Sequence, residues 1–468
     1  MTDNYRKYMS YAALACTAGT FVPGQCVLSA KTHEPGKPNI VFILADDMGI
    51  GDVGCYGQKM IETPNIDALA DAGIRFTSHY SGSTVSAPSR CCLMTGKDTG
   101  HSYIRGNKGS GGFDYPLAAD EVTVAEVLKS AGYATACVGK WGLGGIASQG
   151  HPNNQGFDYF FGYLGQGAAH NYYPDYLYEN SSKVMLDGKV YSHFMIVDKG
   201  LDFIREHSDG PFFAYFAVTP PHADLDYPDI SHYDGRFEEV PHVNRTKNGR
   251  GYKSQPKPRA AYASMVSEVD RNVGAVVSLL DSLGILENTI VIFSSDNGVH
   301  CVGGHDPDYF DSNGPFRGYK RDLYEGGVRT PFVVRWDACI EPGTETGHIS
   351  AFWDFLPTVC DIVGADDPSG INGISYLPVL LGKGRQKEHE YIYYEFYEKG
   401  GKQSILKDGW KLVRLNMSTP DKIKEELYYL PDDIGEQEDL SSRYPEKVAA
   451  LRSLAETSRV ESKIFVWK

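Results

Sequence analysis

Short runs of apolar residues recur along the chain, and each run ends at a polar residue or a glycine. Residues 39–45, 134–138, 212–218 and 289–293 have the length and apolar content of strands that are covered on both faces. Helical signals lie between them, at 64–72, at 124–132 and in the apolar spacing of 266–280. This alternation predicts an α/β domain over 38–364, with a mixed, mainly parallel sheet sandwiched by helices.

From residue 365 onward the pattern changes to shorter strands and turns. Strands are predicted at 391–397 and 410–415, with turn signals at Gly400-Gly401 and Asp408-Gly409, and a last helix at 446–456. We therefore predict a connecting segment over 365–387. A smaller α+β subdomain, an antiparallel sheet with a helix, follows over 388–468.

The first 30 residues have the order of a secretory signal peptide. Arg6 and Lys7 precede a stretch without charged residues, from Tyr8 to Ala30, and glycine and proline within that stretch make it a poor membrane span. The sequence therefore predicts a signal peptide over 1–30 and an exported protein.

The charge and cysteine content argue against three classes of protein. The net charge is −15, and no run of Lys or Arg supplies the basic surface that a nucleic-acid-binding protein needs. Nine cysteines without a CxxC pair fit neither a disulfide scaffold nor a zinc site.

Polar side chains that can do chemistry follow four of the predicted strands. In chain order they are Asp46 and Asp47, Lys140, His222, and Asp296 with Asn297. Each could be an ordinary polar residue at the end of a strand, but parallel sheets bind ligands beyond the carboxyl ends of their strands, where all of these fall. The three carboxylates and the amide oxygen form an all-oxygen set, which Ca²⁺ or Mg²⁺ prefers over zinc.

Ser86 begins a second candidate region. It stands two residues before Pro88, and proline is favoured in the first turn of a helix. The unpaired backbone N–H groups of that turn favour an anion such as phosphate or sulfate. A helix-capping serine without further function is the alternative.

The longer spacing over 86–96, S-x-P-S-R-x-x-L-x-T-G, resembles the signature of the type I sulfatases at every specified position. In this arylsulfatase-like family a Cys or Ser at the first position is converted to formylglycine. The resemblance extends through 324–331 to 427–440 and covers about residues 38–457. It implies an alkaline-phosphatase-like fold and hydrolysis of sulfate esters, and the serine resembles the branch matured by a radical-SAM enzyme.

The resemblance also implies roles for single residues. Asp46, Asp47, Asp296, Asn297 and the converted Ser86 match the metal ligands, and the metal is usually calcium. Arg90 matches a residue that stabilises formylglycine, Lys140 and Lys320 match sulfate contacts, and His222 matches the general acid, a role that the ordinary pKa of histidine suits. Gln166, His170 and Arg317 are further candidates for substrate contacts.

One position departs from the family pattern. Gly142 stands in Gly139-Lys140-Trp141-Gly142-Leu143-Gly144 where the family commonly has a histidine that touches the formylglycine. His170 could enter the pocket instead, although a single histidine in a loop is more often a surface residue. The residue that acts as the base is therefore left open.

We consider three functions. The first is a sulfatase that acts on a sulfated glycan, in the periplasm or at the cell surface of a bacterium, since exported sulfatases of the serine type often belong to bacteria that degrade glycans. The second is a phosphatase or phosphodiesterase of the same fold that uses unconverted Ser86. The third is a calcium-dependent glycan binder without turnover, which Gly142 alone suggests. The identity of the sugar, exo or endo action and the oligomeric state stay open.

Overall fold

The computed structural model describes residues 37–109, 114–246 and 251–467. The signal peptide predicted over 1–30 lies outside these residues. Within them, none of the helices has both the length and the apolar character that crossing a membrane requires.

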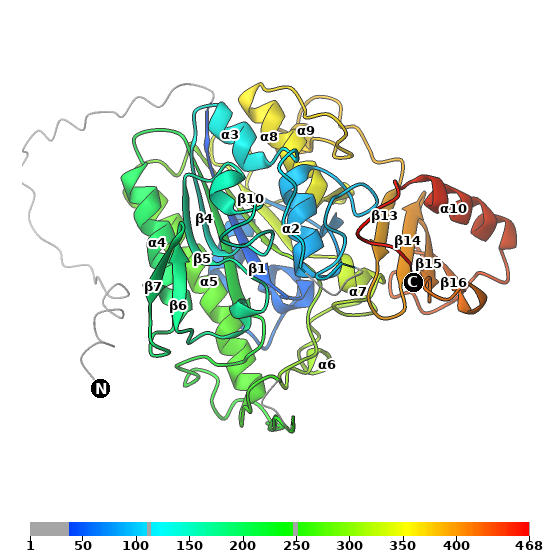
Figure 1. Ribbon diagram of the computed structural model, residues 1–468, viewed down its shortest axis with the longest axis horizontal. Helices are drawn as coiled ribbons and strands as arrows, with labels where there is room; N and C mark the ends of the chain where they lie inside the picture. Colours follow the sequence, from blue (N-terminus) through cyan, green and yellow to red (C-terminus); the bar gives the residue numbers. More distant parts are fainter. Residues whose placement is uncertain (1–36, 110–113, 247–250, 468) are drawn as a thin grey trace, which may run out of the picture. The chain divides into compact units, whose positions relative to one another are not determined.

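A ten-stranded sheet forms the centre of the main domain (Figure 1). Its strands lie in the order β11-β2-β10-β9-β1-β8-β4-β5-β6-β7, and the five from β9 to β5 are parallel. The bounds are β1 Asn39–Asp46, β2 Ile74–Phe76, β4 Ala134–Lys140, β5 Tyr159–Tyr163, β6 Tyr176–Glu179, β7 Ser182–Met185, β8 Phe212–Pro221, β9 Thr289–Ser295, β10 Phe332–Arg335 and β11 Thr344–Thr346. A separate parallel pair joins β3 His79–Tyr80 to β12 Ser350–Ala351.

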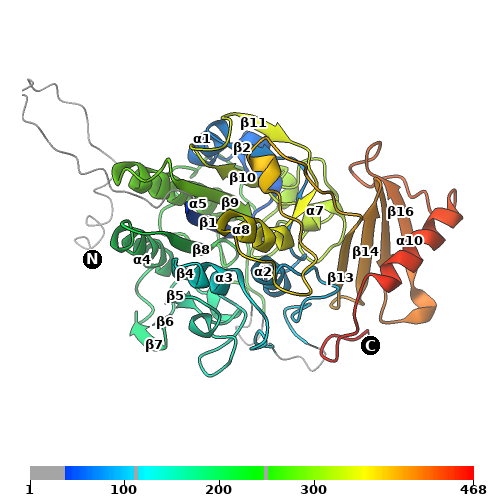
Figure 2. The same cartoon turned by 90° about the horizontal axis from the view of Figure 1, so that it is seen from above.

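Helices cover both faces of this sheet (Figure 2). Along β1, Val41 and Ile43 pack with residues of α1, α4 and α5, whereas Phe42 and Leu44 pack with residues of α2, α3 and α8. Alternate side chains of a strand point to opposite faces, so a continuous apolar run is required here. The helices are α1 Pro64–Asp71, α2 Ser86–Thr95, α3 Val124–Ser130, α4 Ser192–Glu206, α5 Pro258–Ser282, α6 Pro307–Phe310, α7 Glu325–Val328, α8 Phe355–Val363 and α9 Leu377–Leu380. The predicted sandwich is confirmed.

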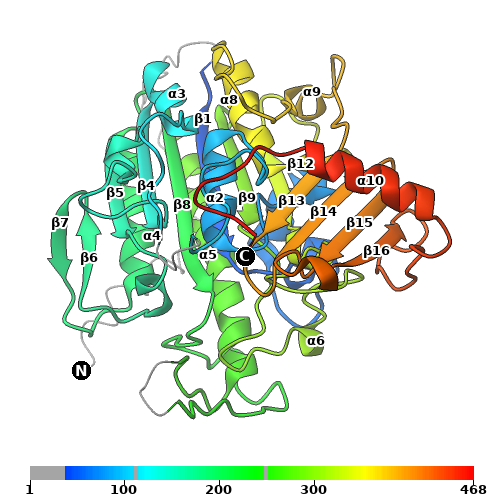
Figure 3. The same ribbon diagram turned by 45° about the vertical axis from the view of Figure 1, so that its right-hand side comes forward.

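A four-stranded antiparallel sheet with one helix forms the C-terminal part (Figure 3). Its elements are β13 Ile392–Phe396, β14 Lys402–Lys407, β15 Trp410–Leu415, β16 Lys424–Tyr429 and α10 Pro445–Thr457. One face packs on α10 through Ile405 and Leu412, and the other packs on the main domain through Tyr394 and Val413. This arrangement agrees with the predicted α+β subdomain.

Buried charges also link the two parts. Glu325 of α7 accepts from Lys411 of β15 at 2.7 Å and from Arg329 at 2.6 Å, and Glu436 lies 3.0 Å from the same Lys411 ammonium. The Glu436 carboxylate also accepts from the backbone N–H of Glu325 at 2.7 Å. We refer to Glu325, Arg329, Lys411 and Glu436 as the junction cluster.

Candidate active site

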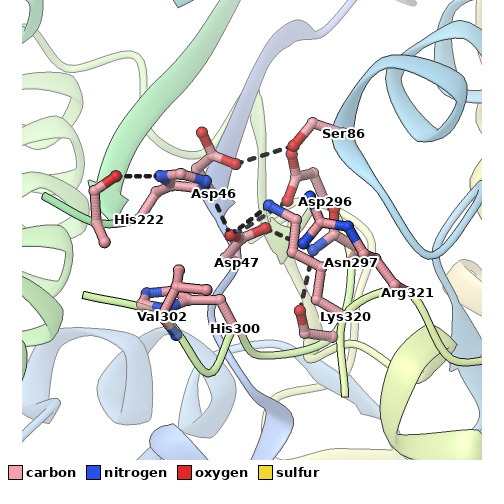
Figure 4. A network of polar contacts seen from close by, with 12 residues as sticks. Asp46, Asp47, Ser86, His222, Asp296, Asn297, His300, Val302, Lys320 and Arg321 are labelled. Carbon is pink, nitrogen blue, oxygen red and sulfur yellow. Dashed lines mark hydrogen bonds and ion pairs between the residues drawn. The ribbon is translucent and has the colours of Figure 1, made fainter. Parts of the chain in front are cut away.

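The carboxyl ends of four parallel strands bring the predicted polar residues to one edge of the sheet. Asp46 and Lys140 are the last residues of β1 and β4, His222 follows β8, and Asp296 follows β9. Ala45 pairs with Ser295 across β1 and β9, so Asp46 and Asp296 continue from neighbouring positions. Figure 4 shows Asp46, His222 and Asp296 at this edge together with Ser86, which contacts Asp46. The structure therefore assembles the site that the strand ends predict.

Ser86 is the first residue of α2, and Val85 is the cap. Its side chain does not cap the helix: the Ser86 Oγ donates to the Asp46 carboxylate and accepts from the Lys140 ammonium, each at 3.1 Å. The residue is only 1% exposed. The interpretation of Ser86 as a helix-capping serine is therefore wrong, and its hydroxyl faces the charged edge of the sheet at the positive end of α2.

The predicted ligand residues contact one another closely. Asp47, whose backbone has the left-handed φ of 63°, accepts from Asn297 Nδ2 at 2.7 Å, and its backbone N–H donates to Asp296 at 3.0 Å. A left-handed non-glycine residue is uncommon outside functional sites. The tight turn after β1 thus places the carboxylates of Asp46 and Asp47 side by side.

Three cations balance three carboxylates in this region. Lys140 donates to Asp46 and Lys320 to Asp47, both at 2.6 Å, and Arg90 donates to Asp296 at 2.8 Å. We refer to these six residues as the active-site cluster. Burial raises the pKa of Asp47, but the nearby positive charges, with Lys320 the strongest, together outweigh burial and lower the pKa to about 2. Burial also raises the pKa of Asp46, but Lys140, His222 and Arg90 together hold it below its ordinary value.

The nearby positive charges compensate the carboxylate of Asp296 less well than those of Asp46 and Asp47. Burial and the charge of Asp46 raise its pKa to about 6 even though Arg90 is paired with it. The neighbouring Asn297 Oδ1 is buried and has no hydrogen-bond partner among the described residues. A raised carboxyl pKa beside an unpartnered acceptor oxygen is what a bound cation would relieve. The donor set therefore fits a hard divalent cation.

His222 belongs to the same group. Its Nε2 lies 3.2 Å from the Asp47 carboxylate, and ligand atoms of Asp46, Asp47 and His222 lie within 4.8 Å of one another. Its Nδ1 contacts the carbonyl of Ala223 at 2.5 Å, which assigns the proton of a neutral ring to Nδ1. Burial and Lys320 lower the pKa of His222 well below its usual value, so the expected near-neutral pKa is wrong for the free site.

Two more histidines border His222. The His170 ring lies 4.3 Å from the His222 ring and stacks on Tyr252, with centroids 5.8 Å apart. His300, which sequence reasoning missed, lies 5.6 Å from His222; its ring contacts the Pro221 carbonyl and accepts from the Val302 N–H. The only feature of the sequence that could have indicated His300 is its position three residues after Asn297. The structure thus places both His170 and His300 beside His222.

Gln166 lies against Gly142. A Cβ added at Gly142 would lie 1.9 Å from Gln166 Nε2, and Gly142 has a φ of 78°. The Gln166 amide contacts the Gly142 carbonyl at 3.4 Å. The glutamine therefore occupies the space into which a side chain at position 142 would extend.

Arg317 is a predicted contact residue that the structure does not bring to the active-site cluster. Its guanidinium donates to the Tyr428 hydroxyl at 2.9 Å and to the Glu436 carbonyl at 2.8 Å, and it lies 4.0 Å from the centroid of the Tyr324 ring. These contacts join the main domain to the C-terminal sheet. The position in the 314–320 stretch could not predict this, because Lys320 in the same stretch points the other way, to Asp47.

Comparisons with protein families agree with the geometry. The family model described as Sulfatase matches residues 38–365, and the model of the C-terminal region of N-sulphoglucosamine sulphohydrolase matches residues 314–457. Together they span the main domain and most of the C-terminal part.

Individual proteins are similar over most of the chain. N-acetylgalactosamine-6-sulfatase of Canis lupus familiaris is 33% identical over 385 residues, which are 77% of this chain and 69% of that protein. Steryl-sulfatase of Homo sapiens is 27% identical over 448 residues, 78% of this chain and 73% of that protein. Among solved structures, Ps i-CgsB in complex with k-i-k-neocarrahexaose has a TM-score of 0.77 and 28% identity, and the match covers 92% of this chain and 95% of that one.

Proposed function

We propose that this chain, which belongs to the sulfatase family, hydrolyses sulfate monoesters carried by carbohydrates. Family membership confirms the resemblance that the 86–96 motif predicts. Two of the similar proteins carry a sugar in their names or complexes, N-acetylgalactosamine 6-sulfate in one and a neocarrahexaose in the other. The observation that carries the proposal is the Ser86 hydroxyl held between Asp46 and Lys140 at the start of α2.

One part of the proposal goes beyond family membership: a radical-SAM enzyme converts Ser86 to formylglycine. A hydrated aldehyde at this position would supply two hydroxyls on one carbon, one able to serve as the nucleophile toward sulfur and one whose proton could be removed so that sulfate leaves. An unmodified serine would instead leave a sulfated enzyme that water has to attack at sulfur. The contacts of Ser86 suit such a group, because Asp46 and Lys140 flank its side-chain oxygen.

The second part of the proposal is that the site binds a divalent cation, for which calcium is the candidate. Asp46, Asp47, Asp296 and Asn297 would hold it, with the converted Ser86 as a further ligand. Such an ion supplies positive charge that favours ionisation of a hydroxyl and polarises a sulfate oxygen. The raised pKa of Asp296 and the unpartnered Asn297 Oδ1 support this assignment.

The cationic side chains bind the anionic group. Lys140 and Lys320 are buried beside Asp46 and Asp47, so an incoming sulfate meets two ammonium groups that are already desolvated. Desolvated charges that are fixed in advance stabilise the growing negative charge of a transition state. Arg90 holds Asp296 and donates to the Lys140 carbonyl at 2.7 Å, so it orients both sides of the site.

His222 protonates the leaving alcohol. Its low pKa in the free site arises from burial and from Lys320 and Lys140, whose charges a bound sulfate offsets. Binding of the substrate thus raises the pKa of His222, so that His222 can carry the proton that the leaving alcohol takes up. The contact between Nδ1 and the Ala223 carbonyl keeps Nε2 as the nitrogen that faces the reacting group.

Mass spectrometry and sulfate release test the proposal together. Protein made beside a radical-SAM maturing enzyme should show a Ser86 peptide lighter by about 2 Da, a modification that a sequence does not display. That protein should release sulfate from sulfated sugars, with estrone sulfate included because a steryl-sulfatase is among the relatives. Turnover of phosphate esters by protein with unmodified Ser86 would contradict the proposal.

We further propose that the protein is exported. The uncharged stretch from Tyr8 to Ala30 behind Arg6 and Lys7 supports this. N-terminal sequencing of the protein from a periplasmic fraction should then begin near residue 31, and an intact Met1 in the cytoplasm would contradict it.

A further inference from the structure

A second cavity, of about 370 Å³, opens between the main domain and the C-terminal sheet. Its wall carries the cationic side chains of Lys108 and Arg321 from the main domain. The C-terminal part contributes Tyr397, Glu398 and Phe465. None of these residues belongs to the active-site cluster, so the cavity is a separate feature of the molecule.

The backbone of Arg321 is held from both sides. Its N–H donates to the Thr84 hydroxyl at 2.8 Å, and its carbonyl accepts from the Lys402 ammonium of β14 at 2.7 Å. It has a left-handed φ of 79°, which few non-glycine residues adopt. Lys320 reaches Asp47 (Figure 4), whereas the next residue, Arg321, forms an ion pair with Glu398 of the C-terminal part. The strained and fixed backbone at Arg321 thus directs the side chain of Lys320 to the active-site cluster and that of Arg321 to the C-terminal part.

The cavity adjoins the reactive end of α2. Thr84 is two residues from Ser86, and two residues of extended chain span at most about 7 Å. On the other side, Asn107 in the cavity wall accepts from the backbone N–H of Ala87 at 3.1 Å. Through Asn107 the cavity wall therefore borders the first turn of α2, beside Ser86.

The charges in the cavity suit an anion. The Arg321 Nε lies 3.6 Å from the Glu398 carboxylate, and both side chains are partly exposed, at 35% and 29%. Within the described residues the guanidinium makes this one long ion pair and no hydrogen bond, so its donors are available to a ligand. Lys108 is exposed and adds a second positive charge.

One aromatic side chain of the cavity wall is partly exposed. Tyr397 is half-buried, and its ring stacks on Trp467 with centroids 4.1 Å apart, whereas Phe465, 5.7 Å from the same tyrosine, is 1% exposed and offers no free face. Tyr397 is therefore the aromatic residue of this wall that can contact a sugar ring.

We infer that this cavity is a second anion-binding subsite, which receives a sulfate or carboxylate on the sugar next to the one that is desulfated. The inference rests on the proposed function. Arg321 and Lys108 bind the charged group, and Glu398 competes with it for Arg321. The preferred substrate is therefore an oligosaccharide with at least two negative charges.

Binding tests the subsite without turnover. Three disaccharides with the same sulfate on one sugar and a neutral, sulfated or uronic neighbour are titrated into Ser86→Ala protein by calorimetry. The charged neighbours should bind more tightly, and Arg321→Gln should reduce that preference about tenfold or more, the effect of losing one charge-assisted hydrogen bond. The sulfated and uronic compounds distinguish the two sources of the anion.

Three further variants sharpen the test. Lys108→Gln should reduce the preference as well, and Glu398→Gln should increase it, because it removes the competing carboxylate. Lys189→Gln, an exposed lysine just after the edge strand β7, removes the same charge and should leave the preference unchanged.

Two results would overturn the subsite: an equal preference in Arg321→Gln and the parent, or an equal loss for the neutral and the charged compounds. The second would place Arg321 at the reactive sulfate itself. If the preference depends on Arg321 but converted protein hydrolyses none of the three sugars, the subsite stands and the proposed function fails.

Discussion

The active-site cluster and the junction cluster are both buried, and in both the acids and bases are equal in number. Each also contains one acid that its neighbours compensate poorly. Burial raises the pKa of Asp296 to about 6 in the first and that of Glu436 to about 7 in the second. Beside Asp296 the unpartnered Asn297 Oδ1 leaves room for a cation, whereas Glu436 faces Lys411 and a backbone N–H.

This difference distinguishes a cation-binding site from a charge cluster that only holds parts of the fold together. In the junction cluster a proton on Glu436 removes the negative charge that its neighbours compensate poorly. At the active-site cluster the carboxylates of Asp46 and Asp47 lie within 4.8 Å of the His222 imidazole, a group of metal-ligand atoms that a proton alone does not satisfy. Variants should therefore affect activity in the first cluster and stability in the second.

Ser86→Ala should give the largest effect. It removes the group that carries the reaction, so kcat/KM for sulfate release should fall by at least about 10⁴-fold, as when a catalytic nucleophile is removed. The melting temperature should stay close to that of the parent. Activity within tenfold of the parent, with the mass of the variant verified, would assign the chemistry to another residue.

Lys411→Met should give the largest loss of stability. It leaves Glu325 and Glu436 buried without their shared cation, and breaking a buried ion pair costs about 3–5 kcal/mol of the free energy of unfolding. Urea unfolding measures this, and kcat of the folded fraction should be kept. Lys407→Met removes a lysine that pairs with Glu390 at the surface, and it should cost far less stability than Lys411→Met. Similar losses in the two variants would contradict a structural role for the junction cluster.

His222→Ala should depend on the leaving group. With sugar sulfates, kcat/KM should fall by about 10²–10³-fold, the usual contribution of a general acid, and with nitrophenyl sulfate the loss should be much smaller. The nitrophenolate leaves without a proton, which makes this substrate the control. Equal losses on the two substrates would rule out the acid role.

Glu436→Gln should change the pH dependence of stability. The folded pKa of Glu436, about 7, lies above the ordinary value of 4.5, so the folded protein binds more protons than the unfolded chain between these values. The free energy of unfolding therefore falls as pH rises from 4.5 to 7, by about 3 kcal/mol at 1.36 kcal/mol per unit. Unfolding curves from pH 4.5 to 8 should lose this slope in the variant and keep it in Glu438→Gln, an exposed control.

Asn297→Ala should give the smallest effect. Losing one amide ligand should weaken calcium binding about tenfold, within the range seen when groups around a metal are removed. The rise in melting temperature with added calcium measures this. Asn272→Ala is the control, because its Oδ1 is also buried and unpartnered but lies in α5. A calcium response that is unchanged in Asn297→Ala would remove Asn297 from the ligand set.

Much of the site could be predicted because the apolar runs in the sequence show where the buried strands end. The apolar runs that end at Asp46 and before Asp296 mark buried parallel strands, and such strands meet at one edge. The 86–96 motif adds Ser86 and Arg90, which the structure places at that edge. The order of elements therefore predicted both the fold and the residues that meet.

Side-chain direction and environment could not be predicted in the same way. Arg317 and Lys320 are three residues apart, yet one contacts Tyr428 and the other Asp47. The pKa of His222 depends on the lysines that the fold places around it, and neither of them is near it in the sequence. The space at Gly142 is filled by Gln166, 24 residues away.

The burial of Ser86 also constrains how the protein is made. At 1% exposure, with α2 packed between the sheet and the C-terminal part, the residue is out of reach of any second protein once folding is complete. An enzyme that oxidises it has to meet the chain during synthesis or before α2 docks. If Ser86 is converted as proposed, a chain that folds before it meets the maturing enzyme would keep an ordinary serine.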